Sequence, residues 1–401
     1  MVRLPSPIKK VFFNHGAWDR FYQKHKDTIR DIELETMVKL KTCGSSERGF
    51  AVYKCSNPSC THEHRIMKGC KGRFCPTCGK GAADRWIEQQ CAILPETDWQ
   101  HITWTMPDVL WPIFEKNRWL VKELSRIASQ IILKDAKKKS VLPGIFTAQH
   151  TFGRKLNWNC HVHLSVTLGG LSKDHQKWES IRFCRKSLEP QWRYAVITLL
   201  RQHYAKLQFP KEIGRVVRHI WDWNRWLDKQ YNRYWNINLA KPKPSHYQNV
   251  KYLGGYVKRA PISQSRLKHY NGHEVIFTYK DHRDGRKKQL RLDTEEFIRR
   301  FLSHIPEKYQ RLINYYGFLA NRVRGKLLPQ VHDVLGQKMR ETRKIRYAQM
   351  LKRSFGIDPF ECPLCRSQLA FVGLVIGKTS AHLKGKFVAQ SLQKIKVKKA
   401  A

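Results

Sequence analysis

Eight residues near the middle of the chain, 160 to 167, alternate strictly between apolar and polar side chains. Successive side chains of a β-strand point to opposite faces, so the pattern predicts a strand with one face on a core. The apolar face holds Cys160, Val162, Leu164 and Val166, and the polar face holds His161, His163, Ser165 and Thr167. His161 and His163 would then present two imidazoles about 6.6 Å apart, which suits a divalent metal site. The alternative is a half-exposed strand that carries two histidines by chance.

The charge of the chain indicates a polyanionic partner. Lysine and arginine number 76 against 32 aspartate and glutamate in 401 residues, which gives a formal net charge of +44. Self-repulsion on this scale is tolerable when a polyanion neutralises it, and nucleic acid is the usual one. The 13 Trp, 15 Tyr and 18 Phe supply rings for the core and for stacking of unpaired bases. An enzyme of small molecules rarely has such a charge.

The cellular compartment is expected to be reducing. The sequence has no run of about 18 apolar residues, so no membrane partner is expected. The N-terminus, Met-Val-Arg-Leu-Pro-Ser-Pro, lacks the apolar core of a signal peptide. The 11 cysteines are therefore interpreted as thiols and metal ligands, not as disulfides.

Local patterns predict an α+β fold. Alternation predicts a strand over 100–105, and 145–150 is a short strand candidate before the histidine strand. Residues 113–137 are mostly compatible with a helix, and the Trp-rich segment 210–236 is interpreted as helical. Asp284-Gly285 between two alternating runs, 274–279 and 287–292, predicts a hairpin. Asp293 and Glu296 predict a capped helix start. We expect three parts, with boundaries at 1–95, 96–330 and 331–401.

The first part contains six cysteines within 36 residues. The two-residue spacing of Cys75 and Cys78 lets two thiolates hold one zinc from a tight turn. The simplest predicted site joins them to Cys55 and Cys60, and a second would use Cys43, Cys70 and either His62 or His64. Zinc would supply much of the folding energy of so small a segment. The alternative is a cluster of free buried thiols.

Two further features of the cysteine regions bear on function. Basic neighbours of the first array, among them Lys71 and Arg73, predict contacts with DNA. Cys362-x-x-Cys365 is half of a metal site, and the sequence leaves open whether Cys184, Cys91 or an N-terminal cysteine completes it. A pair without metal is the other interpretation.

Tyr252 and Tyr256 are four residues apart, which would put both hydroxyls on one face of a helix. Gly254 and Gly255 disfavour that helix by about 1 kcal/mol each. The plain alternative is two ordinary tyrosines among fifteen.

An ordered set of motifs resembles the IS91 family of transposases, which belong to the HUH superfamily with two tyrosines. The set comprises Phe152-Gly153, Leu156-Asn157, His161-x-His163, Gly169-Gly170, Tyr252-Leu-x-x-Tyr256, Arg259, Ile262-Ser263, residues 283–286, 296–302 and 316–321, and the two cysteine regions. The resemblance covers nearly the whole chain. It implies a small N-terminal zinc-binding domain, an HUH endonuclease domain with a central antiparallel RRM-like sheet, and a basic helical C-terminal region. It also implies a bacterial, cytoplasmic protein associated with the nucleoid.

The resemblance implies that the enzyme cuts one DNA strand at a transposon end. Tyr252 and Tyr256 would be the nucleophiles, with a 5′-phosphotyrosine as the intermediate, and Lys258 and Arg259 would hold the phosphate. His161, His163 and a third ligand would hold Mg²⁺ or Mn²⁺, and imidazoles favour Mn²⁺ because Mg²⁺ prefers oxygen. His150 is the preferred third ligand. Gln149 is the alternative, and its side chain would point to the opposite face of the strand.

Two other functional classes are consistent with parts of the sequence. A plasmid relaxase or replication initiator would share the chemistry, but the two cysteine regions disfavour it. A non-catalytic zinc-containing DNA-binding protein would explain the charge and the cysteines. It would not explain the histidine and tyrosine pairs.

The charge leads to the first prediction. Binding to single-stranded DNA should weaken steeply with salt, with a slope of log affinity against log salt of about −0.7 for each neutralised phosphate. Fluorescence anisotropy of a labelled oligonucleotide at several salt concentrations measures it. A flat response would mean that the positive charge serves another partner.

Overall fold

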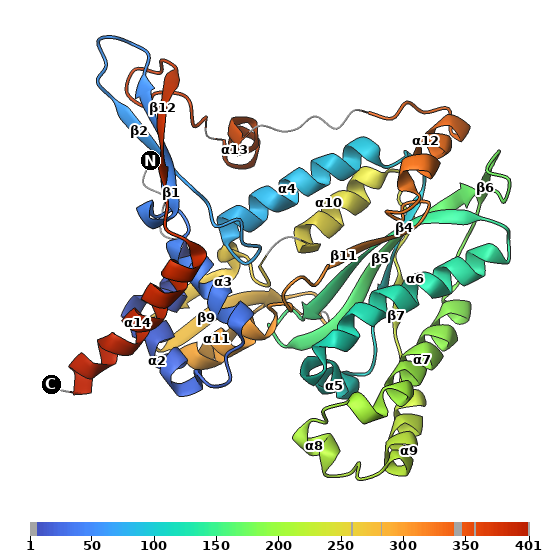
Figure 1. The fold of residues 1–401 in the computed structure, drawn as a ribbon. Coiled ribbons are helices and arrows are strands. Elements are labelled where there is room, and N and C mark those ends of the chain that lie inside the picture. Colours follow the sequence, from blue (N-terminus) through green and yellow to red (C-terminus); the bar gives the residue numbers. More distant parts are fainter. Residues whose placement is uncertain (1–5, 258–259, 282, 341–346, 357, 400–401) are drawn as a thin grey trace.

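The computed structural model describes residues 6–257, 260–281, 283–340, 347–356 and 358–399. These residues form a mixed α+β structure, and every strand pairing among them is antiparallel. The strands lie in a central sheet and two three-stranded sheets. Figure 1 shows the central sheet between layers of helices, with one small sheet projecting away from the body.

The central sheet has the order β11-β4-β5-β3-β7, and β6 pairs with the far end of β5. Its strands are β3 (Trp99–Trp104), β4 (Leu142–Phe152), β5 (Trp158–Leu171), β6 (Trp178–Ser180), β7 (Ile237–Leu239) and β11 (Ile313–Gly317). Three of them confirm the predicted strands at 100–105, 145–150 and 161–167. The long strands β4 and β5 lie side by side in the middle, so they provide the most rigid part of the sheet.

Five helices cover one face of the central sheet, and the sequence predicted all of them except α7 (Arg185–Gln202). The others are α5 (Trp111–Lys116), α6 (Val121–Lys137), α8 (Lys211–Gly214) and α9 (Ile220–Tyr231). The predicted helix 113–137 is divided into α5, a 3₁₀ turn and α6, and the predicted helix 210–236 into α8 and α9. Val162 and Leu164 of β5 are fully buried against this layer. Each such side chain contributes about 1.5–3 kcal/mol through burial.

The opposite face packs against α4 (Pro76–Ile93), α10 (His246–Val257) and α12 (Arg324–Val334). Figure 1 shows α4 and α10 running side by side above the sheet. Gly254 explains how they come so close: a Cβ at this position would lie 2.3 Å from Cγ1 of Ile87 on α4. The glycine therefore disfavours the isolated helix but is required by helix packing.

A second hydrophobic core joins both ends of the chain to the predicted hairpin. It unites α1 (Pro7–Phe13), α2 (Ala17–His25), α3 (Asp31–Thr42), β8 (Leu267–Tyr270), β9 (Glu274–Lys280), β10 (Lys287–Asp293), α11 (Thr294–Ser303) and α14 (Ser380–Lys399). The hairpin of β9 and β10 confirms the prediction. Asp293 caps α11 by accepting from the Glu296 N–H, while the Glu296 carboxylate pairs with Arg299 and Arg300.

The projecting sheet has the order β12-β1-β2, so its edge strand comes from the other end of the chain. Its strands are β1 (Gly49–Cys55), β2 (Glu63–Met67) and β12 (Leu369–Ile376), and α13 (Tyr347–Phe355) precedes β12. Short 3₁₀ helices complete the order: η1 (Asn14–Gly16), η2 (Ser46–Arg48), η3 (Asp108–Leu110), η4 (Arg118–Leu120), η5 (Tyr204–Lys206) and η6 (Gln264–Arg266). Among the described residues no helix has the length and apolarity to cross a membrane.

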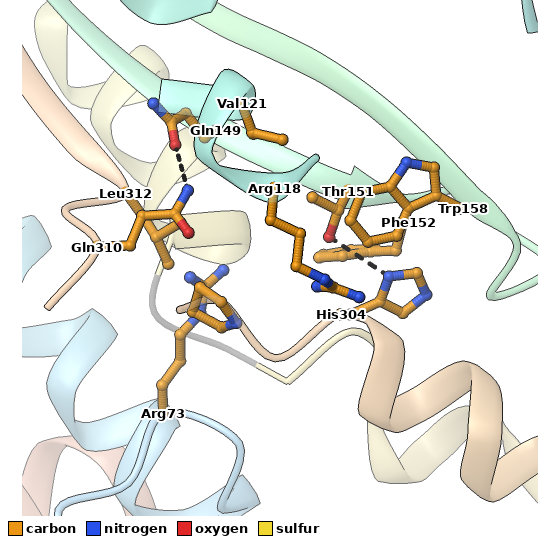
Figure 2. A pocket seen from close by; sticks show the side chains of 11 residues that line it. Arg73, Arg118, Val121, Gln149, Thr151, Phe152, Trp158, His304, Gln310 and Leu312 are labelled. Atoms are coloured by element: carbon orange, nitrogen blue, oxygen red, sulfur yellow. Dashed lines mark hydrogen bonds between the residues drawn. The ribbon is translucent and has the colours of Figure 1, made fainter. Parts of the chain in front are cut away.

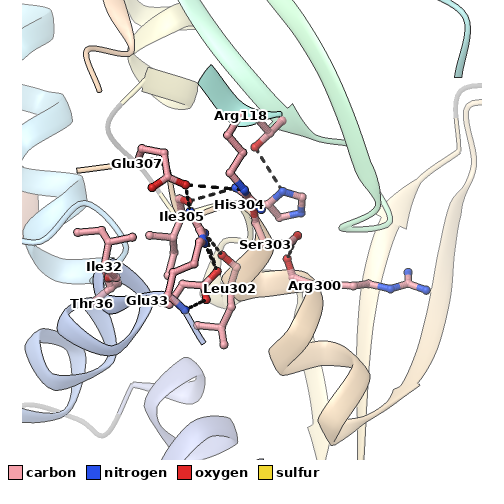
Figure 3. Close-up of polar contacts among 12 residues, drawn as sticks. Ile32, Glu33, Thr36, Arg118, Arg300, Leu302, Ser303, His304, Ile305 and Glu307 are labelled. Carbon is pink, nitrogen blue, oxygen red and sulfur yellow. Dashed lines mark hydrogen bonds and ion pairs between the residues drawn. The ribbon is translucent and has the colours of Figure 1, made fainter. Parts of the chain in front are cut away.

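A polar network attaches α3 and the end of α11 to the central part of the protein (Figure 3). Arg30 pairs with Glu33 and Glu307 and donates to the Ile305 carbonyl at 2.7 Å. Arg118, from the layer beneath the central sheet, donates to the Ser303 carbonyl at 2.7 Å. These contacts hold the segment after α11 from two sides.

The join between β4 and β11 generates a stability prediction. Gly317 has φ +62°, and a Cβ there would lie 1.7 Å from the Pro143 carbonyl oxygen. Gly317→Ala should therefore lower the free energy of unfolding by at least about 2 kcal/mol, because left-handed strain adds to a backbone clash. Thermal unfolding followed by tryptophan fluorescence measures the effect.

Gly336→Ala is the matched control, since Gly336 has φ +64° and a Cβ there would meet nothing within 4 Å. It should cost only the left-handed strain, about 1 kcal/mol. Equal losses in the two variants would contradict the role assigned to the β4–β11 contact.

Candidate active site and metal centres

Three histidines meet on the face of the central sheet that α4 and α10 partly cover. His161 and His163 lie on β5, and His150 lies on β4 directly opposite His161. One ring nitrogen from each comes within 4.8 Å of the others. His150 thus lies on the strand next to His161, on the same face as the other two histidines. Gln149 lies on the other face, where its amide donates to the Lys122 carbonyl at 3.3 Å.

Hydrogen bonds orient the two β5 histidines. His161 Nδ1 lies 2.8 Å from the Asn159 carbonyl oxygen, which can only accept a hydrogen bond, so Nδ1 carries the proton. The Nε2 atoms of His161 and His163 approach to 3.1 Å. Both rings therefore direct Nε2 toward one point, which is the arrangement a bound cation needs.

Burial keeps these imidazoles neutral. Desolvation lowers the pKa of His161, and it lowers the pKa of His163 well below the ordinary value with help from His150, His161 and His101. Neutral imidazole is the metal-binding form, so proton competition is weak at neutral pH.

A fourth histidine, His101, belongs to the cluster and was missed at the sequence level. It lies on β3 beside β5, where it pairs with Ser165, and it is buried. Its Nε2 lies 2.9 Å from His163 Nδ1, and desolvation lowers its pKa to about 4. The signal was available: residues 100–105 alternate, and the alternation puts His101 and Thr103 on one face of the strand.

Tyr252 lies next to the histidines. The helix predicted around it is α10, and the Tyr252 ring is 5.1 Å from the His101 ring and 6.3 Å from the His163 ring. The ring is 46% exposed, so a large substrate can reach it. Position 256 is one turn farther along α10, but its side chain lies outside the described residues, as do Lys258 and Arg259.

A groove of about 1260 Å³ opens over the three histidines and Tyr252. Its lining includes Trp111, Arg154, Lys155, Arg266, Lys280 and Arg283. Among the residues that the structure describes, neither Trp111 Nε1 nor Asn159 Oδ1 has a hydrogen-bond partner, although both atoms are buried there. A groove with cationic walls, an aromatic ring and unsatisfied polar atoms suits a polyanion with hydrogen-bonding groups.

The first cysteine cluster consists of Cys43, Cys70, Cys75 and Cys78. Cys43 Sγ lies 3.5 Å from Cys75 Sγ and 3.6 Å from Cys78 Sγ. Cys75 is the N-cap of α4 and Cys78 lies in its first turn, where the helix dipole stabilises thiolates. Four converging sulfurs fit a structural zinc ion.

The second cluster consists of Cys55, Cys60, Cys362 and Cys365. Cys55 Sγ lies 3.3 Å from Cys365 Sγ, and Cys60 Sγ lies 3.9 Å from Cys362 Sγ. Hydrogen bonds from Ser367 lower the pKa of the Cys365 thiol to about 6, which favours the ligating thiolate. The C-terminal pair therefore finds its partners in the N-terminal array.

The predicted grouping of Cys55 and Cys60 with Cys75 and Cys78 was wrong. The pairing of β1 with β12 sets Cys55 opposite Leu369 and brings the C-terminal pair beside it. The N-terminal array is thus divided between two sites. Neither His62 nor His64 belongs to the clusters found among the described residues.

Comparison with known proteins identifies the family. Residues 144–326 match a family described as "Putative transposase", and residues 13–106 match a "Transposase zinc-binding domain". The transposase for insertion sequence element IS801 of Pseudomonas savastanoi pv. phaseolicola is 40% identical over 393 residues, which cover 96% of this chain and 94% of that protein. The chain belongs to the IS91 family of transposases.

A second relative spans the transposase just as fully. The "Putative transposase y4qJ" of Sinorhizobium fredii (strain NBRC 101917 / NGR234) is 29% identical over 400 residues, 94% of this chain and 98% of that protein. No solved structure matches the transposase significantly. The transposase is an enzyme with DNA as its partner, and its cysteine clusters together with the matched domain support bound zinc.

The two predicted DNA contacts near the first cluster lie in different surroundings. Lys71 is exposed, at φ +53°. Arg73 reaches into a small pocket that Arg118, Gln149 and Gln310 also line (Figure 2). Burial lowers the pKa of Arg73 to about 10, so the guanidinium stays charged at neutral pH. Contact of either residue with DNA stays a prediction.

Two tetrathiolate clusters predict two zinc ions in each chain of the transposase. Cys75→Ser and Cys365→Ser should each remove one ion, because each variant leaves three thiolates in one cluster and four in the other. Elemental analysis of the purified variants measures the loss, and Cys184→Ser is the control outside both clusters. Full zinc content in Cys365→Ser would show that the second cluster holds no metal.

Proposed function

We propose that the transposase cuts and rejoins single DNA strands through a phosphotyrosine intermediate at the histidine cluster. The observation that carries this proposal is the convergence of three imidazoles beside Tyr252 in a basic groove. The nucleophile is Tyr252 or Tyr256. The substrate is the single-stranded end of the transposon, and the same site then joins that end to the target.

His150, His161 and His163 would hold Mg²⁺ or Mn²⁺. When bound, the ion would polarise the scissile phosphate and neutralise the charge that develops on it. The protein's own contribution is to keep His161 and His163 neutral by burial and to orient them through the Asn159 carbonyl and His101. An all-imidazole set favours Mn²⁺.

The tyrosine performs the covalent step. Its phenolic oxygen bonds to phosphorus, and the bond from phosphorus to the 3′-oxygen breaks. The phenol loses its proton, and the released 3′-oxygen takes up a proton to become a 3′-hydroxyl. A phenol near its free pKa of about 10 is a poor nucleophile, so it requires a polarised phosphate. The phosphotyrosine conserves the bond energy, and a later 3′-hydroxyl can reverse the reaction without ATP. Two tyrosines allow two such exchanges in one rolling-circle-like transposition.

The central sheet is proposed to be an HUH endonuclease sheet of the RRM-like type. Its antiparallel order and the position of the histidines on adjacent central strands support this assignment. The groove walls, with Arg154, Arg266 and Lys280, would neutralise the backbone of a single strand, while Trp111 would stack on a base. The zinc-binding part would recognise the transposon ends, and the protein would act on DNA at the bacterial nucleoid.

Tyrosine variants test the covalent step. Tyr252→Phe with Tyr256→Phe should form no covalent adduct with a single-stranded end while still binding it, since only the two hydroxyls are lost. Tyr247→Phe is the matched control, because Tyr247 is an exposed tyrosine of the same helix. Each single variant should impair complete transposition, and Tyr256, which Lys258 and Arg259 follow, is expected to be indispensable. Denaturing gels measure the adduct, and mass spectrometry finds the attached residue.

The histidines are tested in the same assay. His161→Ala and EDTA should each abolish the adduct and leave DNA binding largely intact, since the groove charges remain. An active double tyrosine variant, or DNA attached to another tyrosine, would refute the proposed nucleophiles. Cleavage by His161→Ala at the rate of the unmodified protein would refute the metal site.

A further inference from the structure

His101 contacts both His163 of the proposed metal site and the candidate nucleophile Tyr252, although it is not one of the three clustered ligands. It lies on β3, and its ring stacks on the His163 ring at 5.1 Å with an interplanar angle of 26°. The His101 ring also lies 5.1 Å from the Tyr252 ring, in an edge-to-face arrangement. The two histidines are 7% and 6% exposed, so their mutual contact is sheltered from bulk water.

The atoms in contact determine where the protons must be. His163 directs Nε2 toward His161 Nε2 and Nδ1 toward His101 Nε2. A ring nitrogen that binds a cation carries no proton, so neutral His163 must then have its proton on Nδ1. His101 Nε2 must then accept a hydrogen bond from His163 Nδ1–H at 2.9 Å, so neutral His101 has its own proton on Nδ1. His101 Nδ1 faces Ser165 Oγ at 3.5 Å.

We propose that His101 is a positioning residue of the proposed metal site: by accepting from His163 Nδ1–H, it fixes the tautomer and the ring plane that aim His163 Nε2 at His150 and His161. This inference rests on the proposed function. His101 would keep the His163 ring in the orientation and tautomer that bind a cation before DNA arrives. His161 has its own acceptor, the Asn159 carbonyl, so each of the two β5 ligands has a separate orienting contact.

No other acceptor described near His163 Nδ1 replaces His101 well. Thr103 Oγ1 is 3.5 Å from His163 Nδ1 and 3.3 Å from His101 Nε2, at the outer limit of a hydrogen bond. Without His101, the buried Nδ1–H would lose its short contact, and Nε2 protonation would become relatively more favourable. That tautomer cannot bind a cation. Partners of this kind are typically worth 10- to 100-fold in metal affinity.

Two variants separate the hydrogen bond from simple packing. His101→Gln places an amide oxygen near the position of Nε2 and keeps an acceptor, but it loses the aromatic ring. His101→Phe keeps a ring against His163 and Tyr252 but has no acceptor. A packing role predicts that the phenylalanine variant is the better of the two, and the proposed role predicts the reverse order.

The primary measurement is Mn²⁺ affinity of the full-length, zinc-loaded protein without DNA, by titration calorimetry or electron paramagnetic resonance. His101→Phe should weaken binding by about 10- to 100-fold, whereas His101→Gln should stay within about threefold of the unmodified protein. Adduct formation should fall in the same order and recover in His101→Phe at high Mn²⁺. His382→Gln, at an exposed histidine of α14, is the control.

The outcomes distinguish this inference from the function on which it rests. Unmodified affinity in His101→Phe, or a loss in His101→Gln as large as in His101→Phe, would overturn the positioning role. Absence of Mn²⁺ binding in the unmodified protein, or binding unchanged by His161→Ala, would overturn the metal site and the inference with it. Thermal unfolding of the metal-free variants identifies a loss caused by misfolding, which would assign His101 a structural role instead.

Discussion

The register between β4 and β5 is the constraint on which the proposed active site depends. It sets His150 opposite His161 and Ala148 opposite His163, so the three imidazoles share one face. A slip of one residue would move His150 to the other face and bury polar groups in the core. The buried apolar residues of β5 oppose such a slip, because Val162 and Leu164 must stay in the helical layer. Packing on one face therefore fixes the geometry on the other.

The electrostatics of the protein are divided in a way that suits the proposed chemistry. A chain with a net charge of +44 surrounds a centre of neutral histidines. Burial produces this neutrality by disfavouring the protonated rings, and the pKa of His101 falls to about 4. Cationic side chains line the groove outside the cluster. The groove can thus attract a polyanion close to the place where the histidines would bind a cation, because the imidazoles add no positive charge of their own.

The second cysteine cluster joins parts of the chain that are far apart in the sequence. The second cluster combines Cys55 and Cys60 with Cys362 and Cys365, across a separation of 302 residues between Cys60 and Cys362. The pairing of β1 with β12 and the packing of α14 on α2 and α3 add further contacts between the two ends. The C-terminal region and the N-terminal cysteine array therefore form one unit. Zinc bound by the second cluster would reinforce contacts that close a very long loop.

The sequence by itself determined features that depend on local periodicity and charge. Alternation fixed the histidine strand and its two faces, and Asp284-Gly285 fixed the hairpin. The helix around Tyr252 stayed open in the sequence because of its two glycines, and the packing of α10 on α4 decided it. Only the tertiary structure decided which distant segments meet. It placed His101 against His163 and divided the cysteines into two sets, because strand order and long-range pairing, not local spacing, bring β3 to β5 and β12 to β1. Local patterns determine which face of a strand or helix each side chain is on. They do not determine which distant segment packs against that face, because contacts between distant segments have a loop-closure cost that only the complete packed structure offsets.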